Sequence, residues 1–176
     1  LLGIDEIAPR KGYRSDNDLN HEEYPVHFYY DRLVSQGDYY FNLGQLQQAI
    51  EKYDKAIELD SNEAMAYNNR GTSYDSLGQY QRAMDDHDKA IELDPNLALA
   101  YNNRGLSYRR RLGQYLRAIE DYDKAIELDP DFADAYKNRG ISYHSLGQHQ
   151  RAIEDYDKAI ELDPNLALAY YNRGLS

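Results

Sequence analysis

Asparagine recurs at one position of a repeating segment, and its side chain is suited to recognising a peptide backbone. The members of this column are 34, 35 and 34 residues apart; they are Asn69, Asn103, Asn138 and Asn172. A carboxamide offers an acceptor oxygen and two N–H donors, which complement the C=O and N–H groups of an extended peptide. The alternative is local, because asparagine also caps helices or bonds to neighbouring backbone. Asparagine is mildly unfavourable inside a helix, so its recurrence at this position favours peptide contact over a purely local role.

The sequence lacks the residue patterns that are typical of catalysis. Phosphate-binding, dinucleotide-binding, zinc-protease and serine-nucleophile motifs are all missing. His87 and His149 occupy columns that hold tyrosine in other repeats, which indicates a packing role. The histidines and glutamates of residues 21–27 have no spacing that would fix a metal geometry. We therefore expect no enzymatic activity, no cofactor and no metal.

These residues belong to units that repeat every 34 or 35 residues. Two glycine columns mark the units: Gly37, Gly71, Gly105, Gly140 and Gly174, then Gly44, Gly78, Gly113 and Gly147. Apolar and aromatic residues three or four positions apart predict two amphipathic helices in each unit. The second glycine column predicts the tight turn between them, and Asp94-Pro95 predicts the end of a second helix. One unit cannot bury its apolar stripe alone, so the units must stack.

The repeat resembles the tetratricopeptide repeat, whose signature places an aromatic residue, glycine, tyrosine, alanine and proline at fixed distances. Matching columns include Gly71, Ala90 and Pro95 with their counterparts in other units. The resemblance implies an all-α fold, a right-handed superhelix (α-solenoid) of antiparallel helix pairs with four repeats and a half repeat. The array is expected to span 30–176. Its units are 30–63, 64–97, 98–132, 133–166 and the partial unit 167–176.

The same resemblance implies where a partner binds. The first helix of each unit lines a concave groove in such arrays, and its sixth position, the asparagine column, points into the groove. We therefore expect a scaffold that holds an extended peptide segment of a partner protein through an asparagine ladder. The expected peptide-binding residues are Asn69, Asn103, Asn138, Asn172, Asn68, Asn102, Lys137, Leu106, Ile141 and Arg109.

A chaperone carboxyl-terminal tail is not the expected ligand. Members of the family that bind such tails grip the terminal carboxylate with lysines and arginines set around the asparagine. Here the second position of the first helix holds Met65, Leu99 and Leu168, and Lys137 alone does not make such a clamp. The groove is better matched to a peptide of mixed apolar and polar character.

Two charged columns change together along the array. Arg70, Arg104 and Arg139 share a column of the first helix, and Asp86, Asp121 and Asp155 share one of the second. The first unit has Gln36 and Lys52 at these positions, so both partners are lost at once. This paired loss predicts a repeated, partly buried Arg–Asp ion pair between the helices of a unit.

The third unit contains an extra residue within Arg109-Arg110-Arg111. One interpretation is a solvated turn that absorbs the insertion. The other is an anchor for an acidic group on a partner. The sequence leaves both open.

Composition narrows the class of partner. The formal net charge is −11 and there is no cysteine. An acidic chain is unsuited to duplex nucleic acid, which requires a basic footprint. We find no apolar run long enough to span a membrane and no signal peptide. We therefore expect a protein or peptide partner, no nucleic acid and no membrane, and we favour the cytoplasm.

The two ends of the chain allow several interpretations. Residues 1–29 carry no repeat signature and are expected to be a cap over the first helix, a linker or a segment lying in the groove. The apolar partial unit predicts either further repeats in a longer protein or self-association. Alternative functions are a substrate-recruiting arm of a larger enzyme, such as a glycosyltransferase, and a structural self-assembly module.

Overall fold

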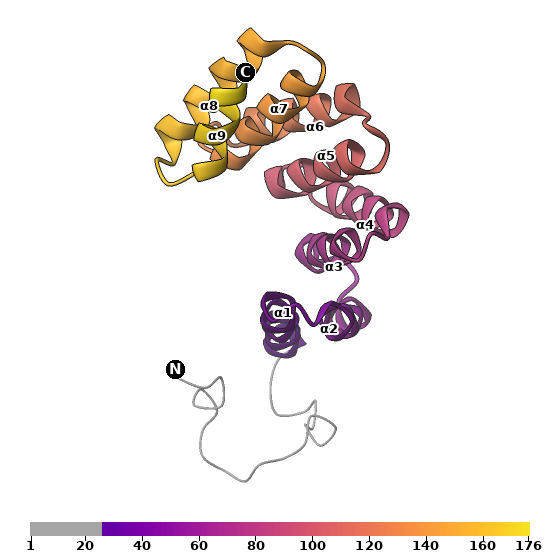
Figure 1. The fold of residues 1–176 in the computed structure, drawn as a ribbon. Coiled ribbons are helices and arrows are strands. Elements are labelled where there is room, and N and C mark those ends of the chain that lie inside the picture. Colours follow the sequence, from indigo (N-terminus) through magenta and orange to yellow (C-terminus); the bar gives the residue numbers. More distant parts are fainter. Residues whose placement is uncertain (1–25) are drawn as a thin grey trace.

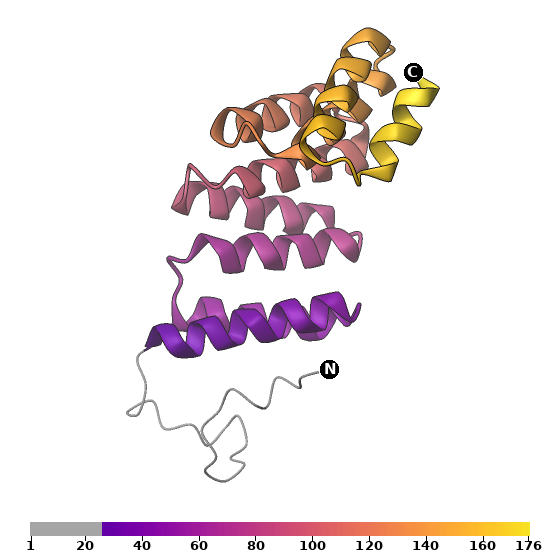
Figure 2. The ribbon, with the colours of Figure 1, turned by 90° about the vertical axis from the view of Figure 1, so that its left-hand side faces the viewer.

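The computed structural model describes residues 26–176, except for the side chains of residues 111 and 112, and this part is helical throughout. Its helices are α1 (Val26–Asn42), α2 (Leu46–Leu59), α3 (Ala64–Ser76), α4 (Tyr80–Leu93), α5 (Ala98–Leu112), α6 (Tyr115–Leu128), α7 (Ala133–Ser145), α8 (His149–Leu162) and α9 (Ala167–Leu175). Consecutive helices pack as pairs, and the pairs stack into a curved array (Figures 1 and 2). The predicted all-α solenoid is confirmed.

The inner side of the curve is formed by first helices. Figure 1 shows α1, α3 and α5 facing the hollow, with α2, α4 and α6 behind them. The helices of a pair approach closely because glycine faces an aromatic ring. A Cβ atom added at Gly105 would lie 2.8 Å from the ring of Tyr122 and 3.1 Å from the carbonyl oxygen of Ala118. Ala118 itself is fully buried. A larger residue at Gly105 would therefore force the pair apart.

Helix ends follow the predicted turn chemistry. Gly78 adopts φ +72°, the left-handed conformation expected of the turn glycine, and the N–H of Gln79 reaches back to the carbonyl of Tyr74 at 2.9 Å. Asp94, extended before Pro95, terminates α4 and accepts the N–H of Asn96 at 3.0 Å on its side chain. These short, fixed connections set the geometry between successive helices.

The extra residue of the third unit lies in a helix. Helix α5 has 15 residues, whereas α3 and α7 have 13 each. Gly113, at φ +57°, ends the helix and leads directly through Gln114 into α6. The insertion therefore lengthens α5, because arginine and leucine are good helix formers. The solvated-turn interpretation is wrong for the backbone of this segment.

The array starts before residue 30. Helix α1 begins at Val26, and Tyr29 and Tyr30 are buried within its first turns, while Phe28 is 46% exposed. Residues 1–25 lie outside the described residues. Most of the expected cap therefore lies outside them, and so do residues 21–25 of the segment that was considered as a metal site. The Nε2 atom of His27 lies 3.3 Å from the Oδ2 atom of Asp31. Among the described residues, no group of three His, Asp or Glu side chains is arranged to hold a metal.

His87 is an exception in the core. It replaces the tyrosine of the other units, is 1% exposed, and neither ring nitrogen has a hydrogen-bond partner. Burial, assisted by the charge of Arg104, lowers the pKa of His87 to about 3. The folded chain therefore excludes a proton that the unfolded chain binds below its ordinary pKa of about 6.5.

We expect His87→Tyr to remove an acid-sensitive element from the array. Stability of the wild type should fall by up to about 1.4 kcal/mol per pH unit as pH drops from the unfolded pKa towards the folded one. The variant loses this contribution, while its carboxylates remain. Urea unfolding at pH 7.5 and 5.0 measures it: the stability advantage of the variant should grow by about 2 kcal/mol at the lower pH. An advantage independent of pH would contradict a neutral buried His87.

Candidate peptide-binding face

An arginine in each of several first helices holds three helices together. Arg70 of α3 donates through Nε and Nη2 to both carboxylate oxygens of Asp86 in α4, at 2.8 and 2.6 Å. Its Nη1 donates to Asp54 of α2, in the preceding unit, at 2.7 Å. The intra-unit pair is the predicted one and is confirmed. The inter-unit contact to Asp54 was not predicted.

The bridge repeats along the array. Arg104 forks onto Asp121 and reaches Asp88; Arg139 forks onto Asp155 and reaches Asp123; Arg173 reaches Asp157. The carboxylates within the units are buried, whereas Asp88, Asp123 and Asp157 are exposed. Burial alone would lower the pKa of Arg104, but hydrogen bonds and charges from Asp121 and Asp88 raise it above its ordinary value. The arginine stays charged, and its position is fixed from two sides.

The asparagines form a continuous chain of side-chain hydrogen bonds, which we call the polar spine; its members are Asp38, Asn69, Asn68, Asn103, Asn102 and Asn138. Contacts between units link first helices: Asn69 donates to Asp38, Asn103 to Asn68, and Asn138 to Asn102, each at 3.0 Å. Within units, Asn68 donates to Asn69 at 3.2 Å and Asn102 to Asn103 at 3.3 Å. The amides therefore connect neighbouring units.

The polar spine ends where lysine replaces asparagine. Lys137 occupies the column of Asn68 and Asn102, and it pairs with Asp134 one turn earlier. It offers no acceptor to the next unit. Asn172, whose counterparts donate to this column, makes no side-chain hydrogen bond within the described residues and is partly exposed. Its amide is available to a ligand.

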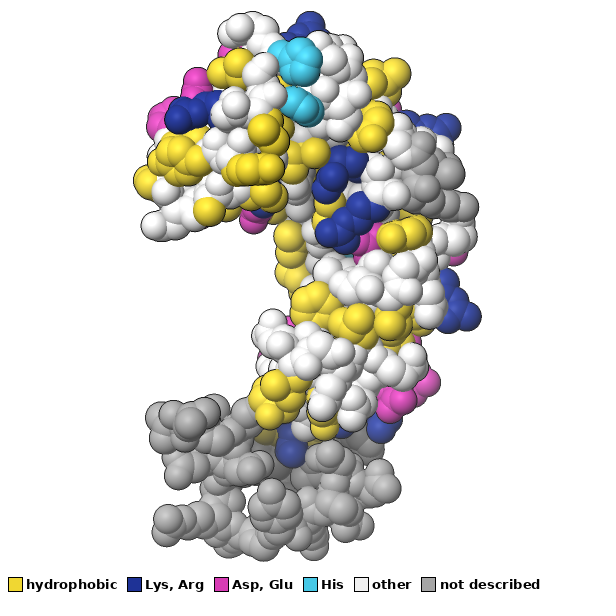
Figure 3. Space-filling view, in the orientation of Figure 1, with side chains coloured by type: hydrophobic (Ala, Val, Ile, Leu, Met, Phe, Trp, Pro, Cys, Tyr) yellow, Lys and Arg dark blue, Asp and Glu magenta, His cyan; other side chains and the backbone are white. Residues whose placement is uncertain are grey.

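The expected site residues differ in accessibility. Asn68, Asn102 and Asn138 are buried, so their amides serve the spine. Asn69, Asn103, Leu106, Ile141, Lys137 and Arg109 are intermediate between buried and exposed. Three more exposed apolar side chains share the second position of the first helices, and we call them the apolar row: Met65 (39%), Leu99 (36%) and Leu168 (51%); Asp134 occupies this position in α7. Figure 3 shows hydrophobic side chains along the hollow of the curve.

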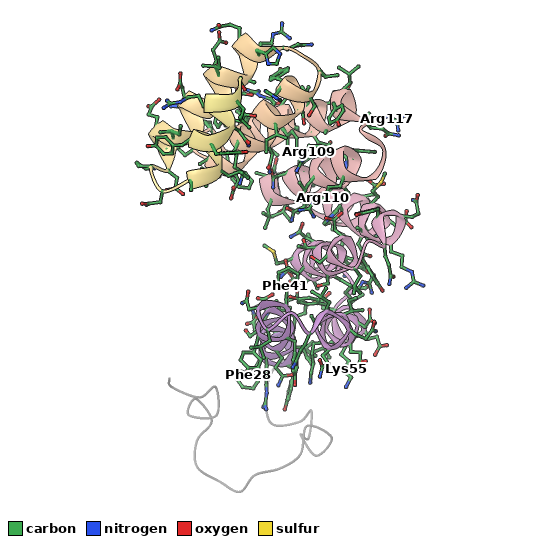
Figure 4. All side chains as sticks on the ribbon, in the orientation of Figure 1. Phe28, Phe41, Lys55, Arg109, Arg110 and Arg117 are labelled. Atoms are coloured by element: carbon green, nitrogen blue, oxygen red, sulfur yellow. The ribbon has the colours of Figure 1, made fainter. Side chains whose placement is uncertain are left out.

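A basic spot lies on the same helix as Leu99 but ten residues further along, about 15 Å towards the end of α5. Figure 4 labels Arg109 and Arg110 on α5, and Figure 3 shows lysine or arginine side chains at this place, to the right of the hydrophobic side chains that border the hollow. Arg110 donates through Nη1 to the buried Asp75 of α3 at 2.5 Å, and Ser107 donates to the other oxygen of Asp75 at 2.9 Å. Asp75 therefore links α3 to α5. The Arg109 Nε atom is buried and has no hydrogen-bond partner.

Comparison of the repeats did not predict two contributions to this face: the aspartates that pair with arginine across units, and Asp38. The sequence did contain a signal for the inter-unit partners. Aspartate recurs in one column of the second helices, and the first unit keeps it although it lacks the arginine; the members are Asp54, Asp88, Asp123 and Asp157. An acidic column retained without its intra-unit partner indicates a partner in the next unit. Asp38 stands alone in its column and gave no comparable signal.

Family models agree with this architecture. A tetratricopeptide repeat model matches residues 64–97 and 133–166, a TPR repeat model matches 37–78 and 109–147, and a further tetratricopeptide repeat model matches 88–120. The chain belongs to the tetratricopeptide repeat family. No curated protein matches it.

Several solved structures are similar to this chain. A crystal structure of MamA is 33% identical, covers 78% of this chain and 80% of its own, and has a TM-score of 0.67. The first TPR of Spaghetti (RPAP3), bound to the HSP90 peptide SRMEEVD, is 29% identical, with 66% and 91% coverage and a TM-score of 0.62. Pseudomonas aeruginosa pilF, 21% identical with 85% and 68% coverage, shares the fold at a TM-score of 0.79.

We expect Asp121→Asn to destabilise the array by about 3 kcal/mol, because it removes the buried partner of a partly buried guanidinium. Asp88→Asn is the matched control: it removes the exposed partner of the same Arg104 and should cost less than about 1 kcal/mol. Thermal and urea unfolding of the two variants measure the difference. Equal losses would show that burial of the carboxylate does not matter and would contradict the bridge as described.

Proposed function

We propose that this chain is a non-catalytic interaction scaffold that holds an extended segment of a partner protein along its first helices. The observation that carries the proposal is a strip on α3 and α5, where the partly exposed amides of Asn69 and Asn103 lie on the same helices as Met65 and Leu99 of the apolar row. Polar groups of the strip are already oriented by the spine. A ligand therefore meets a surface that needs little ordering on binding.

The amides retain capacity for a ligand. Asn69 uses one N–H on Asp38 and accepts one hydrogen bond from Asn68, which leaves one donor and one lone pair. Asn103 donates to Asn68 and Thr72 and keeps an acceptor lone pair. Asn172 retains all its groups. The proposed ladder thus uses the outward half of each amide, while the inward half joins the units.

The apolar row sets the spacing that a ligand would need. Packed helices lie about 8–10 Å apart, and an extended chain advances about 3.3 Å per residue. Every third residue of an extended ligand would therefore meet the equivalent position of the next unit. Met65 and Leu99 would accept apolar side chains at this interval, and the amides would bond to the backbone between them.

The comparisons support a peptide partner in general terms. The first TPR of RPAP3, a structural neighbour, is bound to an HSP90 peptide in its solved structure. This chain lacks the basic residues that we expect for a carboxyl-terminal tail, so we propose an internal, mixed polar and apolar segment as its ligand. In the described residues, no helix is both long and apolar enough to cross a membrane.

Met65→Ser with Leu99→Ser should weaken peptide binding about tenfold or more without unfolding the array, because both side chains are exposed but central to the strip. The measurement uses a library of acetylated, amidated decapeptides of random sequence, with fluorescence polarisation of the best binders. Leu116→Ser is the control, since Leu116 is 66% exposed but lies on the second helix α6. Its affinity should equal that of the wild type.

Circular dichroism and the melting temperature show whether each variant is folded. If the library yields no binder, or if Leu116→Ser weakens binding as much as the double variant, the proposed site is wrong.

Self-association through α9 is a second candidate function. Four large side chains of this short helix are exposed: Leu168, Tyr170, Tyr171 and Leu175. A self-assembly module would use them against a second copy. A recruiting arm of a larger enzyme would instead use the same groove as the proposed scaffold.

We expect the average mass measured by light scattering to rise with protein concentration and Tyr170→Ser with Leu175→Ser to suppress the rise. Leu116→Ser should show the same rise in mass as the wild type, because we attribute self-association to the exposed residues of α9 and not to exposed apolar area in general. A monomer at every concentration would contradict self-association.

A further inference from the structure

We propose that Arg109 binds an acidic side chain within the partner segment, so that the groove selects extended peptides with an aspartate or glutamate flanked by apolar residues. This inference rests on the proposed function and specifies its ligand. It depends on three features of the third unit: a guanidinium without a carboxylate partner among the described residues, occupied neighbours and a central position.

Arg109 has no acidic partner for its charge in the part of the chain that the structure describes. Its Nε atom is buried without a hydrogen-bond partner, although part of the side chain remains accessible. The guanidinium lies close to the buried phenol of Tyr122 in α6: burial raises the pKa of Tyr122, and the charge of Arg109 and a side-chain hydrogen bond to it lower that pKa. Its charge also acts on the buried phenol of Tyr156 in α8. Neutral phenols do not compensate a positive charge. A partly desolvated cation in such surroundings favours an incoming anion.

The nearest acidic neighbour is already occupied. Both oxygens of Asp75 are engaged, one by Arg110 and the other by Ser107. The other arginines on α3 to α9 that belong to first helices and have described side chains are paired with aspartate: Arg70, Arg104, Arg110, Arg139 and Arg173. Arg109 forms no ion pair within the described residues. Among the described arginines of these first helices, Arg109 therefore has the guanidinium that can pair with an acidic group of a ligand.

The position favours a side chain over a terminal carboxylate. Arg109 lies on α5, with first helices of two units on either side of it along the array (Figure 1). A segment that crosses the first helices near the end of α5, where Arg109 lies, continues past Arg109 in both directions. Its anion at this point is then an aspartate or glutamate side chain, and its neighbours meet Leu106 and Ile141. The formal net charge of the whole chain is −11, so the basic spot at Arg109 and Arg110 is a local exception on an acidic protein.

Four decapeptide libraries test the inference. Three are acetylated and amidated, with Glu, Gln or Lys fixed at the fifth position; the fourth has Gln there and a free terminal carboxylate. We expect the Glu library to bind the wild type at least about tenfold more tightly than the Gln library, because charge-assisted hydrogen bonds form with the guanidinium. Lys should bind most weakly, and raising the salt concentration should narrow the difference.

Variants assign the preference to one residue. Arg109→Gln should remove the difference between Glu and Gln, whereas Arg109→Lys should retain part of it because it keeps the charge without the fork. Arg117→Gln is the matched control: Arg117 lies on α6, away from the hollow (Figure 4), and the preference should persist. Circular dichroism of each variant verifies the fold.

The outcomes separate the two levels of the proposal. Equal binding of the Glu and Gln libraries overturns the acidic anchor and leaves the groove intact. A preference for the free carboxylate over the internal Glu overturns the side-chain assignment. A Glu preference that survives Arg109→Gln moves the anchor elsewhere. Failure of all four libraries to bind overturns the proposed function itself.

Discussion

A repeated arginine fork joins the helices of the second, third and fourth units to each other and to the preceding unit. Arg104, for example, joins its own helix to Asp121 of the paired helix and to Asp88 of the preceding unit. Its planar guanidinium fixes directions as well as distances, which a lysine would not. Burial raises the pKa of Asp121 against the opposing effect of Arg104, so desolvation offsets much of the attraction. The bridge specifies geometry more than it adds stability.

The polar spine depends on that geometry. Its inter-unit bonds, such as Asn103 to Asn68 at 3.0 Å, require neighbouring first helices to be held in register. The same amides keep hydrogen-bonding capacity, such as one donor and one lone pair on Asn69. In the proposed function, one row of residues therefore serves both the packing of the units and the recognition of a ligand. The conformational cost of ordering the surface is met during folding, which favours binding of a flexible ligand.

The sequence was sufficient for the local elements and insufficient for contacts between units. Gly78 and Asp94-Pro95 predicted helix ends because turn chemistry acts over a few residues. The Arg70–Asp86 pair was predictable from its joint loss in the first unit. The inter-unit partner Asp54 and the internal bonds of the asparagines were not, since they depend on how two units rotate against each other. The extension of α5 was missed because the basic run was interpreted as turn chemistry although its residues favour helix.

The most direct test of the account follows the asparagine side-chain amides by nuclear magnetic resonance as a library-selected peptide is added. The account predicts shifts for Asn69, Asn103 and Asn172, whose amides keep free capacity, and small changes for the buried Asn68 and Asn102. Unchanged signals for every asparagine in a saturated complex would contradict it, because the peptide would then bind on another face.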